Sequence, residues 1–175
     1  MRIATVNVNG IRAAARKGMG EWLTASAPDI LLLQEVRADE RIAADLLPGY
    51  ESAIWPCRIK GRAGVGVAVR EGGPAGLGEL RYGVAAPGTE EPDVDSGRWL
   101  EADLTLTGLD GLERLTIISA YLHSGQLGTE KMDQKYAHLE LVDARMAELL
   151  ESSESGGPQV IMAGDLNVVR SERDI

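Results

Sequence analysis

The stretch 160–167 carries the residues best suited to chemistry. Four mostly apolar residues lead into Gly164, and Asp165 and Asn167 follow with one leucine between them. A short apolar run of this kind predicts a buried strand. If the extended conformation continues past the glycine, the carboxylate and the carboxamide project from the same face, because side chains alternate along a strand. Such a pair can hold a water or a metal ion with one group and a phosphate oxygen with the other. The alternative is an ordinary turn, in which all three residue types are common.

Other polar side chains stand at the ends of further predicted strands. They are Asn7, Glu35, Tyr121 and His123. Ligands of α/β proteins gather outside the carboxyl ends of strands, so we expect these groups to converge with Asp165. Two carboxylates and two carboxamides would form an oxygen-rich site that suits Mg²⁺ or Mn²⁺ better than zinc. The sequence contains no CxxC pair, Walker-type phosphate loop or GxSxG motif, which removes several other classes of enzyme.

The elements that must position these residues alternate between strand and helix patterns. Strands are predicted at 3–9, 30–33, 65–69, 99–106, 115–121 and 160–164, and helices at 19–27, 39–47 and 131–151. The run 30–33 is apolar at every position, which is typical of a central strand covered on both faces. The strands 99–106 and 115–121 are expected to form a hairpin. The segment 71–97 is rich in Gly, Pro, Glu and Asp and is predicted to be mostly loop. The fold class is therefore α/β or mixed α+β.

The helix predicted at 131–151 has the clearest periodicity. Leu139, Val142 and Met146 recur at helical spacing and predict a face that packs on the core, with Tyr136 one turn earlier on the same face. His138 lies on this helix and is interpreted as a solvated or packed histidine rather than a ligand.

Composition excludes some functions and leaves others open. The chain has 175 residues, enough for one domain, and a net charge of −9, which argues against a general affinity for nucleic acid. Residues 1–70 carry ten Lys and Arg against seven Asp and Glu, whereas residues 71–175 carry eight against twenty. The basic loop 58–64 could contact a phosphate backbone, although a solvated loop is at least as well supported. A lone Cys57, no signal-peptide pattern and no membrane-length apolar run predict a cytoplasmic protein.

Three motifs together resemble a known family. They are Thr-Val-Asn-Val-Asn-Gly-Ile-Arg at 5–12, Pro-Asp-Ile-Leu-Leu-Leu-Gln-Glu at 28–35 and Gly-Asp-Leu-Asn at 164–167. They resemble the exonuclease III / AP endonuclease family, within the endonuclease–exonuclease–phosphatase superfamily. The Asn-Gly-Ile-Arg run and the closing Glu-Arg-Asp-Ile at 172–175 are more similar to the exonuclease III branch. The resemblance covers the whole chain and is weakest at 71–97.

The resemblance implies a fold and an activity. The expected fold is a four-layer α/β sandwich, with 1–175 as the N-terminal portion of a single nuclease domain whose second sheet is incomplete. The expected activity is Mg²⁺-dependent hydrolysis of phosphodiester bonds by metal-activated water, with Mn²⁺ able to substitute. It would act as a 3′–5′ exonuclease on duplex DNA and as an endonuclease at abasic sites, in a protein expected to be a monomer.

The resemblance also implies roles for individual residues. Glu35 matches the principal metal ligand, with Asn7 beside it. Asp165 matches the residue that orients or deprotonates the attacking water, and Asn167 the one that steadies the transition-state phosphate. Both are also counted among the metal-site residues. Tyr121 matches a tyrosine that hydrogen-bonds near the scissile phosphate or the leaving group.

Three further residues are expected to contact the substrate. They are Asn9 and Arg12, in the Asn-Gly-Ile-Arg run, and Ser124, which stands where some relatives carry Asn. The family's catalytic histidine has no counterpart, because neither His123 nor His138 follows an aspartate. Two alternatives therefore remain open. One is a phosphodiesterase or phosphatase of the same superfamily with another substrate, such as a phosphoinositide. The other is a catalytically incomplete module that binds DNA or a partner.

Overall fold

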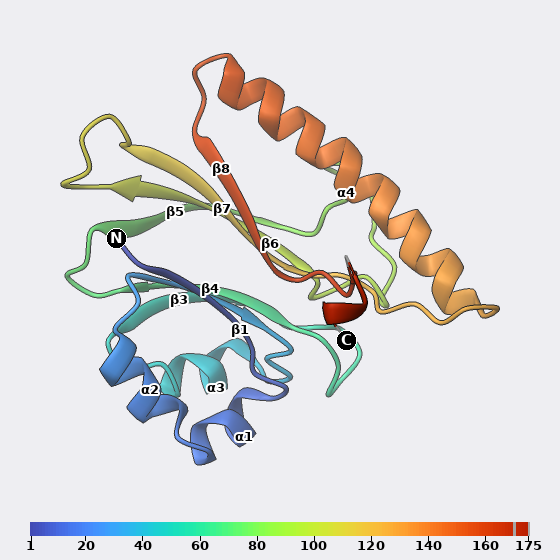
Figure 1. Cartoon of the computed structure of the whole chain (residues 1–175), viewed down its shortest axis with the longest axis horizontal. Helices are drawn as coiled ribbons and strands as arrows, with labels where there is room; N and C mark the ends of the chain where they lie inside the picture. Colours follow the sequence, from blue (N-terminus) through green and yellow to red (C-terminus); the bar gives the residue numbers. More distant parts are fainter. Residues whose placement is uncertain (170, 175) are drawn as a thin grey trace.

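The computed structural model describes residues 1–169 and 171–174, in which two four-stranded sheets stack face to face with helices on both outer sides. Three short helices cover the outer face of the first sheet and one long helix lies along the outer face of the second (Figure 1). The first half contains β1 (Ile3–Asn7), α1 (Ile11–Arg16), α2 (Met19–Ser26), β2 (Ile30–Gln34), α3 (Glu40–Asp45), β3 (Tyr50–Trp55) and β4 (Val65–Arg70). The second half contains β5 (Ala75–Tyr82), β6 (Trp99–Leu106), β7 (Arg114–Tyr121), α4 (Glu130–Glu154), β8 (Gln159–Asp165) and a 3-10 turn (Glu172–Asp174). The predicted four-layer α/β sandwich is thereby confirmed.

Each sheet contains one parallel pair of strands that ends at the same edge. The first sheet has the order β1-β2-β4-β3, with β1 parallel to β2. The second has the order β5-β6-β7-β8, with β7 parallel to β8. The predicted hairpin of β6 and β7 is confirmed as an antiparallel pair. The carboxyl ends of the two parallel pairs are where the predicted site residues begin.

Strand β2 explains why its residues are apolar at every position. Ile30 and Leu32 pack into the core between the two sheets, and Leu31 and Leu33 pack into the core under α1–α3. All four are fully buried. Alternate side chains of β2 thus pack into two different cores, so every position of the strand must be apolar.

Polar side chains join the two sheets inside the molecule. The Gln34 amide donates to Ser119 Oγ at 3.1 Å, and the Ser119 hydroxyl donates to the Leu33 carbonyl at 2.9 Å. Gln34 and Ser119 are both buried. Because a buried polar group is costly unless it is paired, these bonds favour one register of sheet on sheet.

Some predicted elements need correction. The segment 71–97 was expected to be mostly loop but contains β5, and β3 and α1 were not predicted. The first strand ends at Asn7 rather than at residue 9, and the helix after Asp39 ends at Asp45. Tyr136 is 59% exposed, so its placement on the core face was wrong. The final residue of the closing 172–175 motif lies outside the described residues.

None of the described helices combines the length and apolar character needed to cross a membrane.

Candidate functional site

The predicted polar side chains lie close together at the ends of four strands. Asn7 and Asp165 are the last residues of β1 and β8, Tyr121 is the last residue of β7, and Glu35 follows β2. The Asn7 side-chain amide donates to Glu35 Oε1 and to Asp165 Oδ2, each at 2.8 Å. One carboxamide therefore bridges two carboxylates from different sheets. The expected convergence of Asn7, Glu35 and Asp165 is what the structure shows.

Glu35 is held in its ionised form by its neighbours. Its side chain is only 12% exposed, and burial alone would raise its pKa. Hydrogen bonds from Asn7 and Tyr121, together with the charge of Arg37 that contacts the carboxylate, outweigh burial and lower the pKa of Glu35 below its ordinary value. The carboxylate is therefore ionised across the neutral pH range.

Tyr121 is a hydrogen-bond donor rather than a base. Burial, and next the hydrogen bond to Glu35, raise the pKa of Tyr121 to about 12. The guanidinium of Arg98 lies 5.0 Å from the centre of the tyrosine ring, and the Tyr121 N–H donates to the Arg98 carbonyl at 2.8 Å. The phenol is therefore fixed in position and stays protonated at neutral pH.

Asp165 and Asn167 are joined by a turn, not by a continuing strand. The Asn167 backbone N–H donates to Asp165 Oδ1 at 3.1 Å, and Asn167 has φ 49°, in the left-handed region. Of the two alternatives that the sequence leaves open, the turn is the one observed, because β8 ends at Asp165. The Asn167 amide nitrogen donates to the Leu122 carbonyl at 2.8 Å, which leaves its second N–H for another acceptor. The turn, rather than alternation, places the two side chains.

Gly164 permits the close approach that positions Asp165. Its φ is 151°, and a Cβ added there would lie 1.9 Å from the Ala120 carbonyl oxygen of β7. Only glycine fits this point of the β7–β8 pair. The glycine directly before Asp165 is therefore a requirement of backbone packing at the site.

The three residues predicted to contact the substrate lie at different distances from the Asn7, Glu35 and Asp165 group. The Asn9 backbone N–H donates to Asn7 Oδ1 at 3.0 Å, so its main chain supports the cluster while its side chain is exposed. Arg12 is exposed on α1, and no described contact joins it to the cluster. Ser124 is exposed, and its carbonyl accepts from Lys135 Nζ at 3.5 Å. Of these three residues, only Asn9 contacts the central group directly.

The backbone is strained at several of these positions. Asn9, Glu35 and Asn167 are three of the six non-glycine residues with positive φ in the described part of the chain. Such conformations are unfavourable and persist where the surrounding structure requires them. Two hydrogen bonds that fix the neighbouring loops are Gly10 N to Glu35 O at 2.7 Å and Leu122 N to Asp165 O at 3.0 Å.

The donor set has the chemistry of a hard-cation site. Within residues 1–169 and 171–174, no three His, Cys, Asp or Glu side chains form a metal-binding group. Two carboxylates, Glu35 and Asp165, with amide oxygens beside them, are nevertheless the set that Mg²⁺ uses when water and substrate phosphate complete its shell. The residues present therefore fit such an ion.

Sequence reasoning missed three residues that support the site. They are Arg37, which contacts Glu35, Arg98, which lies over Tyr121, and Lys135. Lys135 Nζ donates to the Asn167 carbonyl at 2.7 Å and so joins α4 to the turn. No periodicity or spacing signal marks these cations: Arg98 and Lys135 act on groups distant in sequence, and Arg37, which follows Glu35 closely, lies in an irregular segment.

The two histidines form a separate buried cluster behind Tyr121. His123 Nε2 lies 2.5 Å from Asp95 Oδ1, and the rings of His123 and His138 meet edge to face with centres 5.2 Å apart. Neither ring nitrogen of His138 has a hydrogen-bond partner among the described residues. Burial lowers the pKa of His138 to about 4, so this residue is packed and neutral, one of the two expected possibilities.

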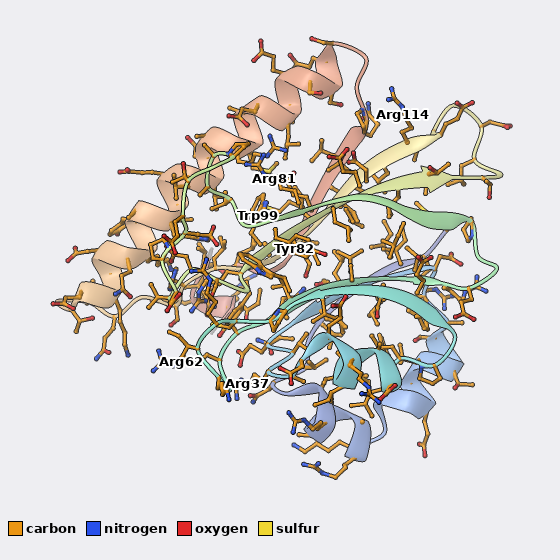
Figure 2. The ribbon with its side chains drawn as sticks, turned by 180° about the vertical axis from the view of Figure 1, so that it is seen from behind. Arg37, Arg62, Arg81, Tyr82, Trp99 and Arg114 are labelled. Atoms are coloured by element: carbon orange, nitrogen blue, oxygen red, sulfur yellow. The ribbon has the colours of Figure 1, made fainter. Side chains whose placement is uncertain are left out.

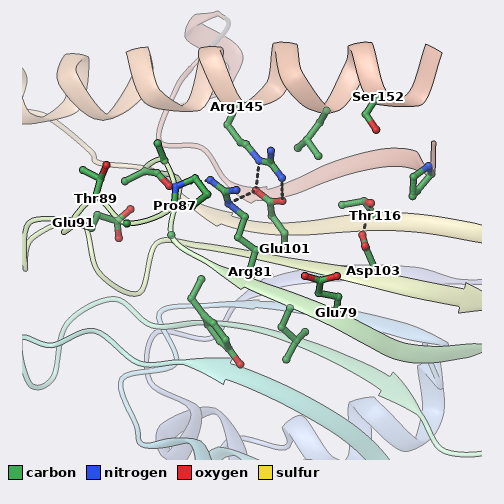
Figure 3. A pocket seen from close by; sticks show the side chains of 18 residues that line it. Glu79, Arg81, Pro87, Thr89, Glu91, Glu101, Asp103, Thr116, Arg145 and Ser152 are labelled. Carbon is green, nitrogen blue, oxygen red and sulfur yellow. Dashed lines mark hydrogen bonds and ion pairs between the residues drawn. The ribbon is translucent and has the colours of Figure 1, made fainter. Parts of the chain in front are cut away.

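A large cavity lies elsewhere, between α4 and the outer face of the second sheet (Figure 3). It has a volume of about 620 Å³, and none of the predicted site residues lines it. Glu101 lies between Arg81 and Arg145 and accepts two hydrogen bonds from Arg145, at 2.7 and 2.9 Å (Figure 3). Asp103 accepts from the Thr116 hydroxyl at 2.5 Å. These mutual pairings are typical of a structural contact between helix and sheet.

Comparison with known proteins places the chain in a family. The model of the Endonuclease/Exonuclease/phosphatase family matches residues 4–175, and the chain belongs to that family. All of the chain aligns with an exodeoxyribonuclease of Bacillus subtilis at 28% identity and with a DNA-(apurinic or apyrimidinic site) endonuclease of Dictyostelium discoideum at 27%. It spans 62% and 44% of the length of those two proteins.

Solved structures agree with the fold. An AP endonuclease from Archaeoglobus fulgidus superimposes with a TM-score of 0.75 at 23% identity, over all of this chain and 60% of the other. The catalytic domain of APE2 from Xenopus laevis superimposes with a TM-score of 0.77 at 22% identity, over 98% of this chain and 60% of the other. At these identities the likeness establishes the fold.

Proposed function

We propose that this protein is a Mg²⁺-dependent DNA repair nuclease that hydrolyses phosphodiester bonds of duplex DNA. The observation that carries the proposal is the bridge from Asn7 to Glu35 and Asp165, with Tyr121 and Asn167 as donors beside it. The names of the aligned relatives, an exodeoxyribonuclease and an apurinic or apyrimidinic site endonuclease, supply the substrate. We propose both activities, 3′–5′ removal of nucleotides and incision at abasic sites, carried by residues 1–175 as part of one nuclease domain.

Glu35 and Asn7 are the residues proposed to hold the metal ion, with Asp165 and Asn167 beside them. Mn²⁺ has the same ligand preference and can substitute. A bound ion would neutralise charge on the phosphate and lower the pKa of a water molecule. Glu35 suits this role because its pKa is lowered and its carboxylate is therefore ionised at neutral pH.

Asp165 is proposed to orient and deprotonate the attacking water. Each of its oxygens already accepts one hydrogen bond, Oδ1 from Asn167 N and Oδ2 from Asn7. A carboxylate oxygen has two lone pairs, so each can accept another. The existing bonds fix the carboxylate in orientation and leave acceptor capacity for a water.

Asn167 and Tyr121 are proposed to stabilise charge on the phosphate and on the leaving oxygen. Asn167 has one amide N–H not used by the Leu122 carbonyl, and Tyr121 stays protonated at neutral pH. Fixed donors aimed at developing negative charge are among the strongest contributions to catalysis. Asn9, Arg12 and Ser124 are proposed to contact the flanking DNA.

The decisive test replaces Asp165 by Asn and, separately, Asn167 by Ala in the full-length protein. Each variant is expected to reduce kcat on an abasic duplex by about 10²–10⁴-fold while leaving the Kd for DNA within about twofold, because each group acts in the transition state. Asp143→Asn, an exposed carboxylate on α4, is the matched control. Near-normal turnover in both variants would remove the assigned roles. Duplex with an abasic site, duplex with a recessed 3′ end and a phosphoinositide should be compared as substrates.

A further inference from the structure

Another, smaller cavity is lined in part by Tyr121, and Glu35 is not among its described lining residues. Its volume is about 220 Å³, and it lies between the loop 57–62 and the first turns of α4. We call it the Tyr121 cavity. Its lining includes the cations Arg62, Arg98 and Lys131 and the polar groups of Tyr121, His123 and Ser124. No carboxylate is among the described lining residues.

This concentration of positive charge is unusual in a chain with a net charge of −9. Among the described side chains, neither Arg62 nor Lys131 is paired with a carboxylate, and both are exposed. Arg58, on the same loop as Arg62, is instead neutralised by Asp93 at 2.9 Å. The loop also lies beside Arg37, whose backbone N–H donates to the Ala63 carbonyl at 3.0 Å, and Figure 2 labels both Arg62 and Arg37 in this region. Unpaired cations such as Arg62 and Lys131 attract an anion.

The inner wall of the cavity is rigid and offers donors. Arg98 donates through Nε to the Val94 carbonyl at 2.7 Å and through one terminal nitrogen to the Tyr121 carbonyl at 3.3 Å. A guanidinium has five N–H groups, so others remain available. His123 is 93% buried, and Asp95 fixes its Nε2, which leaves Nδ1 as the second polar atom of the ring.

The wall of the cavity is joined to the candidate site by direct contacts. Tyr121 lines the cavity and hydrogen-bonds to Glu35. Lys135 donates to the carbonyls of both Ser124, in the cavity wall, and Asn167, in the site. A group bound in the cavity therefore lies beside the substrate phosphate that the site would cleave.

We propose that the Tyr121 cavity binds a second phosphate group of the nucleic-acid substrate, not the one that is cleaved, with Arg62 and Lys131 supplying the charge. The volume corresponds to roughly seven water molecules at about 30 Å³ each, which accommodates a phosphate and is too small for a base pair. This inference rests on the proposed function, because it takes a nucleic acid as the substrate. The bound group is either an internal phosphodiester or a terminal phosphate.

The test measures binding rather than cleavage, so it is independent of the catalytic assignment. Full-length Arg62→Gln and Lys131→Gln proteins are titrated with a fluorescent duplex by anisotropy in EDTA, at several salt concentrations. Each variant is expected to bind about 5–10-fold more weakly. The slope of log affinity against log salt concentration is expected to become smaller in magnitude by about 1. Lys60→Gln, an exposed lysine on the same loop that does not line the cavity, is the charge-matched control and is expected to reduce affinity less than twofold.

Substrates with one neutral methylphosphonate at successive positions locate the phosphate. At one position the wild-type protein is expected to lose as much affinity as the Arg62 variant, and the variant is expected to lose nothing further. If the loss of affinity is non-additive with the Arg62 substitution at an internal position, the bound group is a phosphodiester. If it is non-additive only when a 5′-phosphate end is removed, the bound group is a terminal phosphate. Both results support the proposal.

Two results would overturn it. One is an affinity of the Arg62 and Lys131 variants equal to that of the Lys60 control. The other is a weaker affinity of the variants that no single methylphosphonate substitution in the DNA reproduces. In that case the two cations would act only through the long-range electrostatic field of the protein. If binding behaves as expected but no substrate is cleaved, the proposed nuclease function fails while the phosphate site stands.

Discussion

The hydroxyl of Tyr121 is the clearest single-residue contribution to the site. With a pKa of about 12 it remains a donor at neutral pH, and Arg98 and Glu35 fix the ring and the oxygen. Replacement by Phe keeps the ring and removes only the donor. Tyr121→Phe is expected to lower kcat by about 10–10²-fold with little change in the Kd for DNA. Single-turnover cleavage of an abasic duplex measures this directly.

Tyr136→Phe is the matched control, because Tyr136 is 59% exposed on α4 and lies in no described contact with the site. The control is expected to cleave at the wild-type rate. An unchanged rate for Tyr121→Phe as well would mean that the phenol only supports Glu35 and does not contact the reacting groups.

At the scale of elements, α4 carries a buried histidine with a predictable effect on stability. The pKa of His138 falls from its ordinary 6.5 to about 4 on burial. Between these values the unfolded chain binds a proton that the folded chain excludes, so the free energy of unfolding decreases as pH falls from about 6.5 to about 4. The loss reaches about 3 kcal/mol, and the full contribution is present above pH 6.5.

Replacing His138 by Phe tests this argument. The substitution removes the titrating group and two nitrogens that have no described partner, so the protein is expected to be more stable at pH 7 by about 1 kcal/mol or more. Its urea midpoint is also expected to change less with pH between 6.5 and 4 than that of the wild type. Asp95, His123 and Arg98 face the same ring and are present in both proteins, so the difference between the proteins isolates His138. An identical acid slope would contradict the assignment.

Strand β8 depends on a glycine next to the catalytic candidate. Gly164→Ala would place a Cβ 1.9 Å from the Ala120 carbonyl oxygen, so β7 and β8 must separate. The expected loss is about 3 kcal/mol or more in the free energy of unfolding, together with a loss of cleavage because Asp165 moves. Chemical denaturation and cleavage should be measured together. Gly76→Ala, in β5, where an added Cβ meets nothing within 4 Å, is the control and is expected to have a small effect.

The elements that could be predicted were those with a regular pattern. Strand β2 is apolar throughout because both of its faces are buried, and the long α4 shows its apolar face in the sequence. Strand β5 was missed because a register shift between Leu77 and Leu80 interrupts its alternation and half of it is exposed. The turn at Asn167 could be named only as an alternative, because one hydrogen bond to Asp165, not a periodic pattern, determines it.

At the scale of the whole molecule, the pairing of Gln34 with Ser119 favours one stacking of the two sheets. Ser119→Ala leaves the buried Gln34 amide without its acceptor and is expected to cost about 1–3 kcal/mol. It is also expected to reduce cleavage, because the site residues come from both sheets. Ser52→Ala is the matched control, since the Ser52 hydroxyl is buried without a described partner and its removal should be neutral or stabilising. Equal losses for the two variants would mean that Ser119 contributes only packing.

The bridge from Asn7 to Asp165 joins residues 158 positions apart in the chain. A ribosome adding about 5–20 residues per second makes these two residues roughly 8–30 s apart. During that interval β1 and its asparagine have been synthesised, but their partner in the second sheet has not. The carboxylate pair of the candidate site therefore cannot assemble on a nascent chain until β8 has emerged. Any hydrolytic activity that needs both carboxylates is therefore delayed until β8 has been synthesised.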